Sequence, residues 1–201
     1  MSLIGKSAIV TGGTGALGMV VLRRFLDEGV RITASYRDPK ELNNVPSTVR
    51  SRISFFQADV TDEKAVLRLF ETAAKTDTRL DILVNTVGGF LGRKLIPDVT
   101  IEEWDRMMNI NLRSTFLCSR EALRRMKDQG YGRVINISAM VGLNPTAGRS
   151  AYAISKSAVS LFTEIAGLEQ KGSGITVNAI APSIIDTAAN RESMPDEDFR
   201  R

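Results

Sequence analysis

Short runs of consecutive apolar residues alternate along the chain with longer segments in which apolar residues recur every three or four positions. The short runs predict strands at residues 6–11, 31–35, 52–57, 80–85, 133–137 and 175–179. The longer segments predict helices, most clearly at 16–28, 101–127 and 150–171. Strands that are apolar on both faces and alternate with helices are typical of a parallel sheet covered on both sides. We therefore expect a doubly wound α/β fold with three layers and six strands.

Local signals indicate where some of the helices begin. Thr61 is a suitable N-cap for a helix whose apolar face holds Ala65, Val66, Leu69, Phe70 and Ala73. Thr100 and Glu103 have the spacing of a capping box at the start of the helix to about residue 127. The segment 186–201 is polar and has no clear apolar period. Because no linker, repeat or low-complexity stretch interrupts the pattern, we expect one domain over residues 1–201.

Composition excludes several classes of protein. The chain has 201 residues, of which 43% are hydrophobic and 25% charged, as in an ordinary globular protein. The net charge of +4 is small, and Lys and Arg are scattered rather than gathered in one stripe, which argues against nucleic-acid binding. No apolar run approaches the roughly 18 residues of a membrane span, and no signal peptide precedes the first strand. We therefore expect no membrane partner.

The content of cysteine and histidine limits the chemistry. Cys118 is the only cysteine, so an internal disulfide is impossible, and we expect a reducing, cytoplasmic compartment. We expect its thiol to be buried in a helix rather than to act as a nucleophile. The chain has no histidine, which excludes Ser-His-Asp and Cys-His catalysis and argues against a zinc site. Acid–base chemistry must therefore use Tyr, Lys or carboxylates.

Tyr152 and Lys156 lie four residues apart in a predicted helix and so share one face. A free phenol has a pKa of about 10 and is a poor acid or base at neutral pH. We expect the Lys156 ammonium to lie beside the phenol and lower its pKa, with the Ser138 hydroxyl binding the oxygen whose charge changes. By itself this spacing is common by chance and usually marks a solvated helix face.

Three glycines follow the first predicted strand and lead into the first helix. Gly12, Gly15 and Gly18 have the G-x-x-G-x-x-G spacing, which allows a tight turn, close approach of a pyrophosphate and close packing of the helix on the strand. The helix N-terminus offers free N–H groups to phosphate. In this place the loop favours a dinucleotide, and the missing Gly-Lys-Ser/Thr excludes a P-loop.

The end of the second strand bears on the choice between NADP and NAD. Tyr36 stands at the deciding position and Arg37 follows, which favours the 2′-phosphate of NADP. Asp38 lies about twenty residues past the loop, where an acidic residue would bind the ribose hydroxyl of NAD. Arg37 and Asp38 could equally form a turn and a helix cap. NADP is therefore the expected cofactor and NAD the alternative.

With these motifs in order, the chain resembles the short-chain dehydrogenase/reductase family over nearly its whole length. Further matching segments are Ala58-Asp59-Val60, residues 83–88, residues 109–112 with Asn111, residues 134–138 ending at Ser138, and residues 177–182 followed by Thr187. The glycine loop looks most like that of the 3-oxoacyl-carrier-protein reductases. The resemblance implies a Rossmann-like fold and hydride transfer between a dinucleotide and a ketone or secondary alcohol.

The resemblance also implies roles for individual residues. The catalytic set would be Asn111, which holds a water in a proton relay, Ser138, Tyr152 as acid or base, and Lys156, which lowers the Tyr pKa and holds the nicotinamide ribose. Cofactor contacts would come from Gly12, Thr14, Gly15, Leu17 and Gly18 at the pyrophosphate and adenosine, Arg37 at the 2′-phosphate, Asp59 and Val60 at adenine, Asn85 along the ribose, and Ile185 and Thr187 at the carboxamide.

The chain departs from the family pattern in several places. Thr86 and Val87 replace the second Asn and the Ala of the L-V-N-N-A-G motif, so we expect that turn to be wired differently. Ala16 takes the place of a usual glycine, and Ser183 replaces the Gly after Pro182. Relatives continue past the sixth strand into a substrate-covering helix pair and a seventh strand. We therefore expect this sequence to be a C-terminally incomplete piece of a longer protein.

Two functions remain open at this point: an oxidoreductase, or a nucleotide-binding module without turnover, such as a redox sensor or an assembly subunit. Helices 101–127 and 150–171 are expected to pair with a second copy, since relatives often form homo-oligomers through them. Either that interface or the core would hold Leu123, Met126, Leu161 and Phe162. A largely apolar substrate pocket is expected beside Phe90, Leu91, Met140, Leu143 and Asn144.

Overall fold

All six predicted strands form one parallel sheet in the computed structural model, which describes residues 2–194. The strands are β1 (Ser7–Thr11), β2 (Arg31–Tyr36), β3 (Ser54–Gln57), β4 (Ile82–Asn85), β5 (Gly132–Ile137) and β6 (Ile175–Ile180). Their order in the sheet is β3-β2-β1-β4-β5-β6, and every neighbouring pair is parallel. This order confirms the doubly wound, Rossmann-like fold.

Five longer helices connect the strands: α1 (Ala16–Asp27), α3 (Glu63–Thr76), α4 (Ile101–Met107), α5 (Ser114–Lys127) and α7 (Ser150–Glu169). Short helical turns fill the loops: η1 (Pro39–Asn44), α2 (Ser47–Arg50), η2 (Ile96–Asp98), α6 (Met140–Leu143) and α8 (Ala188–Ser193). A π-helical segment, η3 (Met108–Arg113), joins α4 to α5. None of the helices in the described part is long and apolar enough to cross a membrane.

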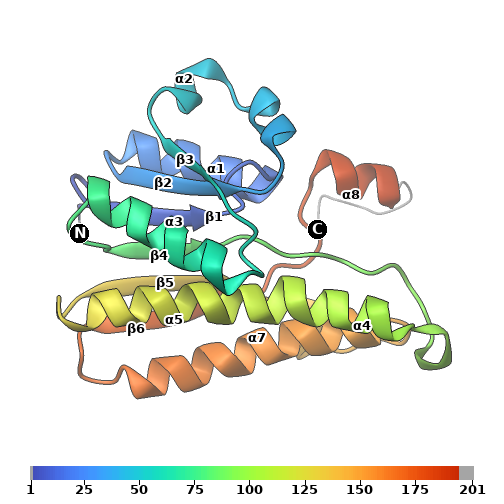
Figure 1. The fold of residues 1–201 in the computed structure, drawn as a ribbon. Helices are drawn as coiled ribbons and strands as arrows, with labels where there is room; N and C mark the ends of the chain where they lie inside the picture. Colours follow the sequence, from blue (N-terminus) through green and yellow to red (C-terminus); the bar gives the residue numbers. More distant parts are fainter. Residues whose placement is uncertain (1, 195–201) are drawn as a thin grey trace.

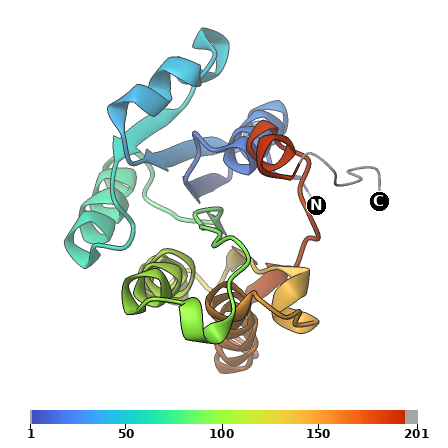
Figure 2. The same cartoon turned by 90° about the vertical axis from the view of Figure 1, so that its right-hand side faces the viewer.

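Two apolar cores, one on each face of the sheet, make the three layers (Figures 1 and 2). On one face α3, α5 and α7 pack on the sheet through a cluster that includes Phe70, Leu83 and Val134. On the other face α1 packs on β1 and β2 through a cluster that includes Leu22 and Val10. Both clusters consist of residues from the apolar runs and helical stripes of the sequence, so apolar burial accounts for the layer order.

The structure corrects one expectation about the helices and adds detail to two others. Asp62, not Thr61, is the N-cap of α3, and its carboxylate accepts a bond from the Lys64 N–H. The predicted helix 101–127 is continuous but contains the π-helical segment η3. The polar segment from residue 186 forms α8, capped by Thr187, while residues 195–201 lie outside the described residues.

The structure also tests the expectations for Cys118 and for the four apolar residues of the two long helices. Cys118 is fully buried in α5, and burial raises the pKa of its thiol, as expected for a residue of the core. Met126 is also fully buried, and Leu123 and Phe162 pack against the same core, whereas Leu161 is exposed. Three of the four residues for which the sequence allowed either a core or an interface position therefore belong to the core.

The first helix can lie close to the first strand only because of Gly18. A Cβ atom added there would lie 2.2 Å from the Gly12 carbonyl oxygen and 2.8 Å from the Gly13 Cα. Both are backbone atoms of the turn, so neither can move without opening the turn. The glycine thus fixes the distance between the α1 N-terminus and the loop that it follows.

We predict that Gly18→Ala lowers the free energy of unfolding by about 2 kcal/mol, since overpacking against backbone must push α1 away from the loop. Urea denaturation measures the change. Gly92→Ala is the matched control: nothing lies within 4 Å of a Cβ added there. Its effect should stay below about 0.5 kcal/mol. Equal losses in the two variants would contradict this reading of Gly18.

Candidate active site

The carboxyl ends of the strands share one edge of the sheet, and the loops that follow them carry most of the predicted site residues. Figure 2 faces this edge, with α1 and α8 on one side and α5 and α7 on the other. Two adjoining cavities lie along it, and Thr86 and Gly88, which follow β4, line both. The strand order reverses between β1 and β4, which is where doubly wound sheets bind ligands.

The first cavity, of about 460 Å³, is called the glycine-loop cavity here. Its lining comes from the glycine turn, the end of β2, the loop after β3 and the helix around η3. Predicted cofactor residues among them are Gly12, Thr14, Gly15, Arg37, Asp59 and Val60. Six expected contacts from three separate segments thus meet at one concave surface.

The turn that forms the floor of this cavity is held by strand β2 and by Thr86. The N–H groups of Gly12 and Gly13 donate to the Ser35 hydroxyl (3.1 Å) and carbonyl (2.9 Å). The Thr86 hydroxyl donates to the Thr11 carbonyl at 2.5 Å. Gly12 has φ +64°, and a Cβ there would meet the Val87 side chain at 2.9 Å. Thr86 therefore links the loop after β4 to the glycine turn, and Val87 lies close beside that turn.

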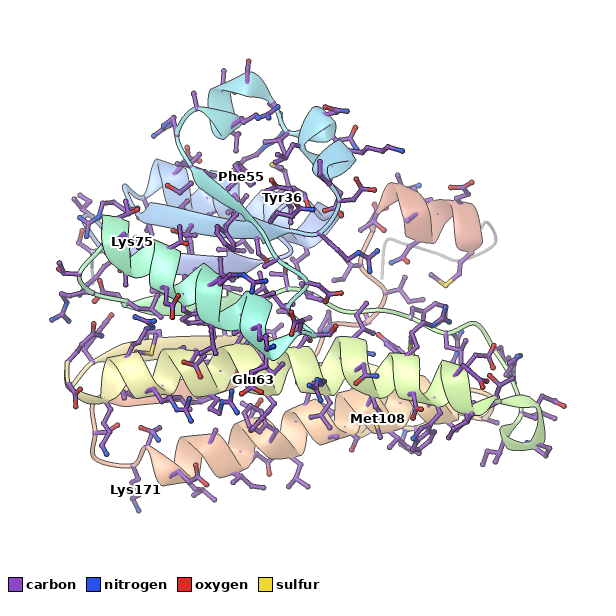
Figure 3. The ribbon with its side chains drawn as sticks, viewed as in Figure 1. Tyr36, Phe55, Glu63, Lys75, Met108 and Lys171 are labelled. Carbon is purple, nitrogen blue, oxygen red and sulfur yellow. The ribbon has the colours of Figure 1, made fainter. Side chains whose placement is uncertain are left out.

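The charges around the glycine-loop cavity are arranged by local hydrogen bonds. Glu41 accepts bonds from the Thr14 hydroxyl and from the Asp38 N–H at 3.0 Å. Arg37 lines the cavity next to Tyr36, which Figure 3 shows at the end of β2, and no acidic partner is found for it among the described residues. Asp38 caps η1 through the Lys40 N–H, so the sequence alternative of a helix cap holds for Asp38. Arg37 remains available to an anion.

The second cavity, of about 550 Å³, is called the tyrosine cavity here. It is lined by three of the four predicted catalytic residues, Ser138, Tyr152 and Lys156, and by the predicted cofactor residues Leu17 and Ile185. Phe90, Met140 and Asn144 also line it, as expected of the substrate pocket, whereas Leu91 does not and Leu143 lines a separate groove beside β6.

Lys156 is a buried cation at the centre of this arrangement. Its side chain comes from α7, and its Nζ donates to the Ile137 carbonyl at the end of β5 at 2.8 Å. Burial lowers the pKa of the ammonium to about 8. A Cβ on Gly88 would lie 3.1 Å from this Nζ, so only glycine lets the loop after β4 pass so close. The loop after β4 and the Lys156 side chain are therefore packed closely against each other at Gly88.

Tyr152 does not behave as the sequence led us to expect. Burial raises the pKa of its phenol, and the nearby cation that opposes this shift is Arg149 rather than Lys156. The ring packs edge-on against Phe90, with centroids 5.1 Å apart. The expected depression of the Tyr152 pKa by Lys156 is thus wrong for this structure, because Lys156 is turned towards the Ile137 carbonyl. A protonated phenol at neutral pH is a proton donor rather than a base.

Asn111 lies in the π-helical segment η3 and bonds to residues next to the tyrosine cavity. Its Oδ1 accepts from the Gly89 N–H at 2.9 Å, and its Nδ2 donates to the Gly89 carbonyl at 3.1 Å and to the Ser155 hydroxyl at 3.0 Å. The Ser155 hydroxyl in turn donates to the Tyr152 carbonyl. Asn111 is fully buried and so touches the cavity only through Gly89 and the helix that carries Tyr152. π-helical segments often occur at functional sites.

Ser138 follows β5 and lies against the helix of the tyrosine. Its N–H donates to the Ile180 carbonyl at 2.8 Å, and its hydroxyl donates to the Lys156 carbonyl at 2.8 Å and contacts the Ser160 hydroxyl at 2.7 Å. The hydroxyl lines the tyrosine cavity, yet in this structure its bonds go to α7. Ser138 therefore couples the end of β5 to α7.

Three predicted cofactor residues line neither cavity. Gly18 is buried under the turn. Asn85 is 3% exposed and donates to Asn136 (2.9 Å) and Ser119 (3.1 Å), so its side chain belongs to a buried polar cluster between β4, β5 and α5. The Thr187 hydroxyl caps α8 by accepting from the Asn190 N–H. Direct contact by these three side chains therefore stays a prediction of the sequence resemblance.

Sequence reasoning missed several residues that line the cavities. Glu41 and Arg106 line the glycine-loop cavity, and Arg149 lines the tyrosine cavity. Glu41 had a detectable signal, since Asp38 and Glu41 have the spacing of a capping box. Arg106 and Arg149 had none, because a single arginine in a helix or loop is usually solvated.

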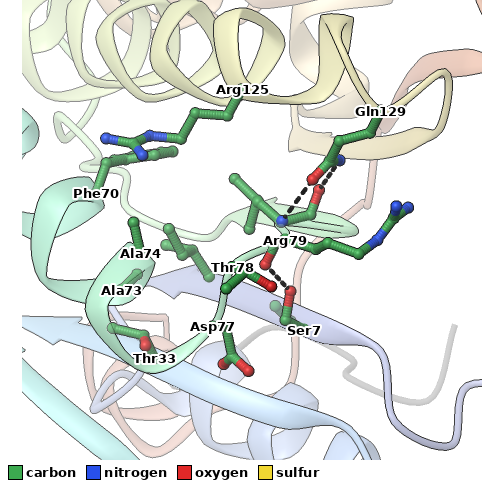
Figure 4. Close-up of a pocket in the computed structure, with 13 residues that line it drawn as sticks. Ser7, Thr33, Phe70, Ala73, Ala74, Asp77, Thr78, Arg79, Arg125 and Gln129 are labelled. Carbon is green, nitrogen blue, oxygen red and sulfur yellow. Dashed lines mark hydrogen bonds between the residues drawn. The ribbon is translucent and has the colours of Figure 1, made fainter.

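A third cavity, of about 170 Å³, lies at the amino-terminal ends of the strands (Figure 4). Its polar groups mostly pair with one another: Gln129 bonds the Leu80 N–H and carbonyl, and the Ser7 hydroxyl bonds the Arg79 carbonyl. Arg125 lies over the Phe70 ring at 5.9 Å. These contacts close the bottom of the core, so the two larger cavities are the better site.

Comparison with known proteins agrees with this geometry. The family model described as short chain dehydrogenase matches residues 6–198. Glucose 1-dehydrogenase 2 of Bacillus subtilis is 32% identical over 201 residues, which cover 97% of this chain and 78% of that protein. An uncharacterised oxidoreductase of Staphylococcus aureus (strain USA300) is 30% identical over 194 residues, covering 96% of this chain and 84% of the relative.

Solved structures give the same result. ElxO with NADP bound superimposes with a TM-score of 0.89 at 32% identity, covering 94% of this chain and 78% of that one. An NAD⁺-bound xylitol dehydrogenase has a TM-score of 0.90 at 27% identity, covering 96% and 76%. With the family model matched over almost the whole sequence, the chain belongs to the short-chain dehydrogenase family of oxidoreductases.

Proposed function

We propose that this protein transfers a hydride between NADP(H), with NAD(H) as the alternative, and a ketone or secondary alcohol. The observation that carries the proposal is the meeting of Ser138, Tyr152 and Lys156 in a cavity that adjoins the glycine-loop cavity. A reacting carbonyl beside Tyr152 would thus lie next to the nicotinamide end of a bound dinucleotide. The cytoplasmic location, the single domain and the incompleteness of the chain stay predictions from the sequence.

The residues present fit a dinucleotide. Gly12, Gly15 and Gly18 leave the turn free of side chains where the backbone must approach a pyrophosphate, and α1 directs its first N–H groups at the same place. Arg37 lies in the cavity without an acidic partner among the described residues, which suits a 2′-phosphate. The bound cofactor supplies or accepts the hydride; the chain provides position and proton transfer.

The proton chemistry follows from the burial of the two catalytic side chains. Because burial raises the pKa of Tyr152, the phenol stays protonated near neutral pH and donates its proton to the carbonyl oxygen during reduction. Lys156, whose ammonium is held by the Ile137 carbonyl, lines the same cavity. Ser138 and Asn111 keep α7, β5 and the loop after β4 in register with this pair.

We also propose that the protein forms a homo-oligomer through α5 and α7. Large apolar side chains are exposed along these helices at Phe116, Ile154, Leu161, Ile165 and Leu168. A contiguous apolar face of this kind is typical of a protein–protein interface.

Tyr152→Phe should lower kcat for a panel of ketones by about 10²- to 10⁴-fold, because the proton donor is removed, and should change the Kd for NADPH by less than roughly threefold. Steady-state kinetics and calorimetry measure the two effects. Tyr131→Phe, at the far end of β5 among Lys6 and Arg133, is the control and should leave both unchanged. An unchanged rate in Tyr152→Phe would contradict the mechanism. Cofactor binding without turnover of any ketone by the unmodified protein would favour the nucleotide-binding module.

Arg37→Gln should weaken binding of NADP about tenfold and of NAD by less than roughly twofold, because a charge-assisted bond to the 2′-phosphate is lost. Calorimetric titration with each dinucleotide measures the difference. Arg23→Gln, on the exposed side of α1, is the matched control and should alter neither affinity. Equal weakening of NADP and NAD would show that Arg37 does not discriminate between them.

The Lys156 pKa of about 8, against an ordinary value of 10.5, predicts a pH-dependent stability. Below about pH 8 the ammonium is charged in the folded and unfolded chain, so the cost of burying it is fully present. Between about pH 8 and 10.5 the unfolded chain binds more protons than the folded one, so the free energy of unfolding rises with pH. The full rise is worth about 3 kcal/mol.

Lys156→Met should remove this rise from the urea-denaturation profile, whereas Lys171→Met, at an exposed site beyond α7, should keep it. Parallel profiles for the unmodified protein and Lys156→Met would mean that the ammonium is not buried as described.

A further inference from the structure

The tyrosine cavity is positively charged. Of the residues that line it, all within the described part of the chain, only Arg149 and Lys156 carry a charge, and no Asp or Glu is among them. Most of the other side chains are apolar, including Leu17, Phe90, Met140, Ile184 and Met194. Lys156 is already held by the Ile137 carbonyl at 2.8 Å. Arg149 is therefore the cation that this cavity presents to a ligand.

Arg149 is fixed beside the catalytic tyrosine by its neighbours on both sides. Its carbonyl accepts the Ala153 N–H at 2.7 Å, at the start of the helix that carries Tyr152. Its guanidinium lies 4.6 Å from the centroid of the Phe90 ring, and that ring packs edge-on against Tyr152. The Lys94 N–H donates to the Gly148 carbonyl at 2.9 Å, which ties the two loops together. The side chain is thus placed before any ligand arrives.

The guanidinium has no acidic partner among the described residues. Other half-buried or exposed arginines of the chain pair with carboxylates: Arg120 with Glu63, Arg124 with Glu121, and Arg31 with Asp77. Arg149 is half-buried, and its guanidinium lies over the Phe90 ring. A cation drawn partly out of water is stabilised when an anion meets it. Its planar fork of N–H donors matches the two oxygens of a carboxylate.

We propose that the substrate carries a carboxylate that Arg149 binds, so that the protein acts on an oxo acid or the corresponding hydroxy acid. This inference rests on the proposed function, since it assigns the substrate class of the same site. In reduction, the carbonyl carbon gains the hydride from the reduced dinucleotide and its oxygen gains the Tyr152 proton, while the carboxylate is unchanged. The apolar lining holds the carbon chain between the two ends.

Kinetics with acids and their esters test the proposal. The probes are 2-oxo and 3-oxo acids of increasing chain length and the methyl ester of each, which removes the charge. We expect kcat/KM for the best acid to exceed that for its ester by about tenfold or more, since one charge-assisted pair separates them. Arg149→Gln should abolish this preference by lowering the acid alone, and Arg149→Lys should restore part of it. An ester turned over as well as its acid would overturn the proposal.

The same variants exclude an indirect role. If Arg149 acted only through the proton affinity of Tyr152, Arg149→Gln would lower acid and ester equally, which would also overturn the proposal. Arg93→Gln is the matched control: the exposed Arg93 packs on Gly148 in the neighbouring loop but does not line the cavity. It should leave both the rate and the acid preference unchanged.

A binding measurement separates this inference from the proposed function, because it needs no turnover. Benzoate and benzamide, which differ in charge but not in shape, are titrated by calorimetry into protein saturated with NADP. We expect benzoate to bind at least about tenfold more tightly, and Arg149→Gln to remove the difference. Equal affinities, or no binding of either, would overturn the inference. A benzoate preference without turnover of any oxo acid would leave the carboxylate site in place and reject the hydride-transfer function.

Discussion

The site depends on one constraint of the parallel sheet: every strand must end at the same edge, and the strand order must reverse beside β1. In the first half of the chain, β2 and β3 are added on one side of β1, and in the second half β4, β5 and β6 are added on its other side. The loops after β1 and β4 then leave the sheet in opposite directions and cannot cover their own ends. Both cavities lie along this uncovered edge, and they meet at Thr86 and Gly88.

Buried polar groups next to the cavities hold the segments at this edge of the sheet in place through hydrogen bonds. The Lys156 ammonium and the Ser138 hydroxyl each bond to a backbone carbonyl, and Asn111 bonds both backbone groups of Gly89. Each of these bonds joins two different segments, so the loops after β4 and β5, the helix α7 and the segment η3 are tied together. Burial also shifts the pKa values of two side chains of the tyrosine cavity in opposite directions: it raises that of Tyr152 and lowers that of Lys156.

The sheet, its helices and most of the site could be predicted from the sequence, because apolar periodicity and glycine spacing are local signals. Thr61 was mistaken for the N-cap since Asp62 beside it is equally suited. The π-helical segment around Asn111 could not be predicted, because the spacing of apolar residues does not distinguish a short π-helical segment from an α-helix. Nor could the partner of Lys156, since helix spacing suggested Tyr152 whereas the Ile137 carbonyl comes from a strand far along the chain. The position of Arg149 beside the cavity could not be predicted either, because its contact with the Phe90 ring joins residues far apart in the sequence.

In the proposed function, the site at this edge of the sheet transfers a hydride to a carbonyl carbon. The most direct test follows the hydrogen atom itself. The protein is incubated with the oxo acids and with NADPH that carries deuterium at both positions of the nicotinamide C4, and the product is examined by NMR. We expect one deuterium on the carbinol carbon of the hydroxy acid and a hydrogen from the solvent on its oxygen. A hydroxy acid without deuterium, or bound NADPH that yields no product from any member of the panel, would contradict it.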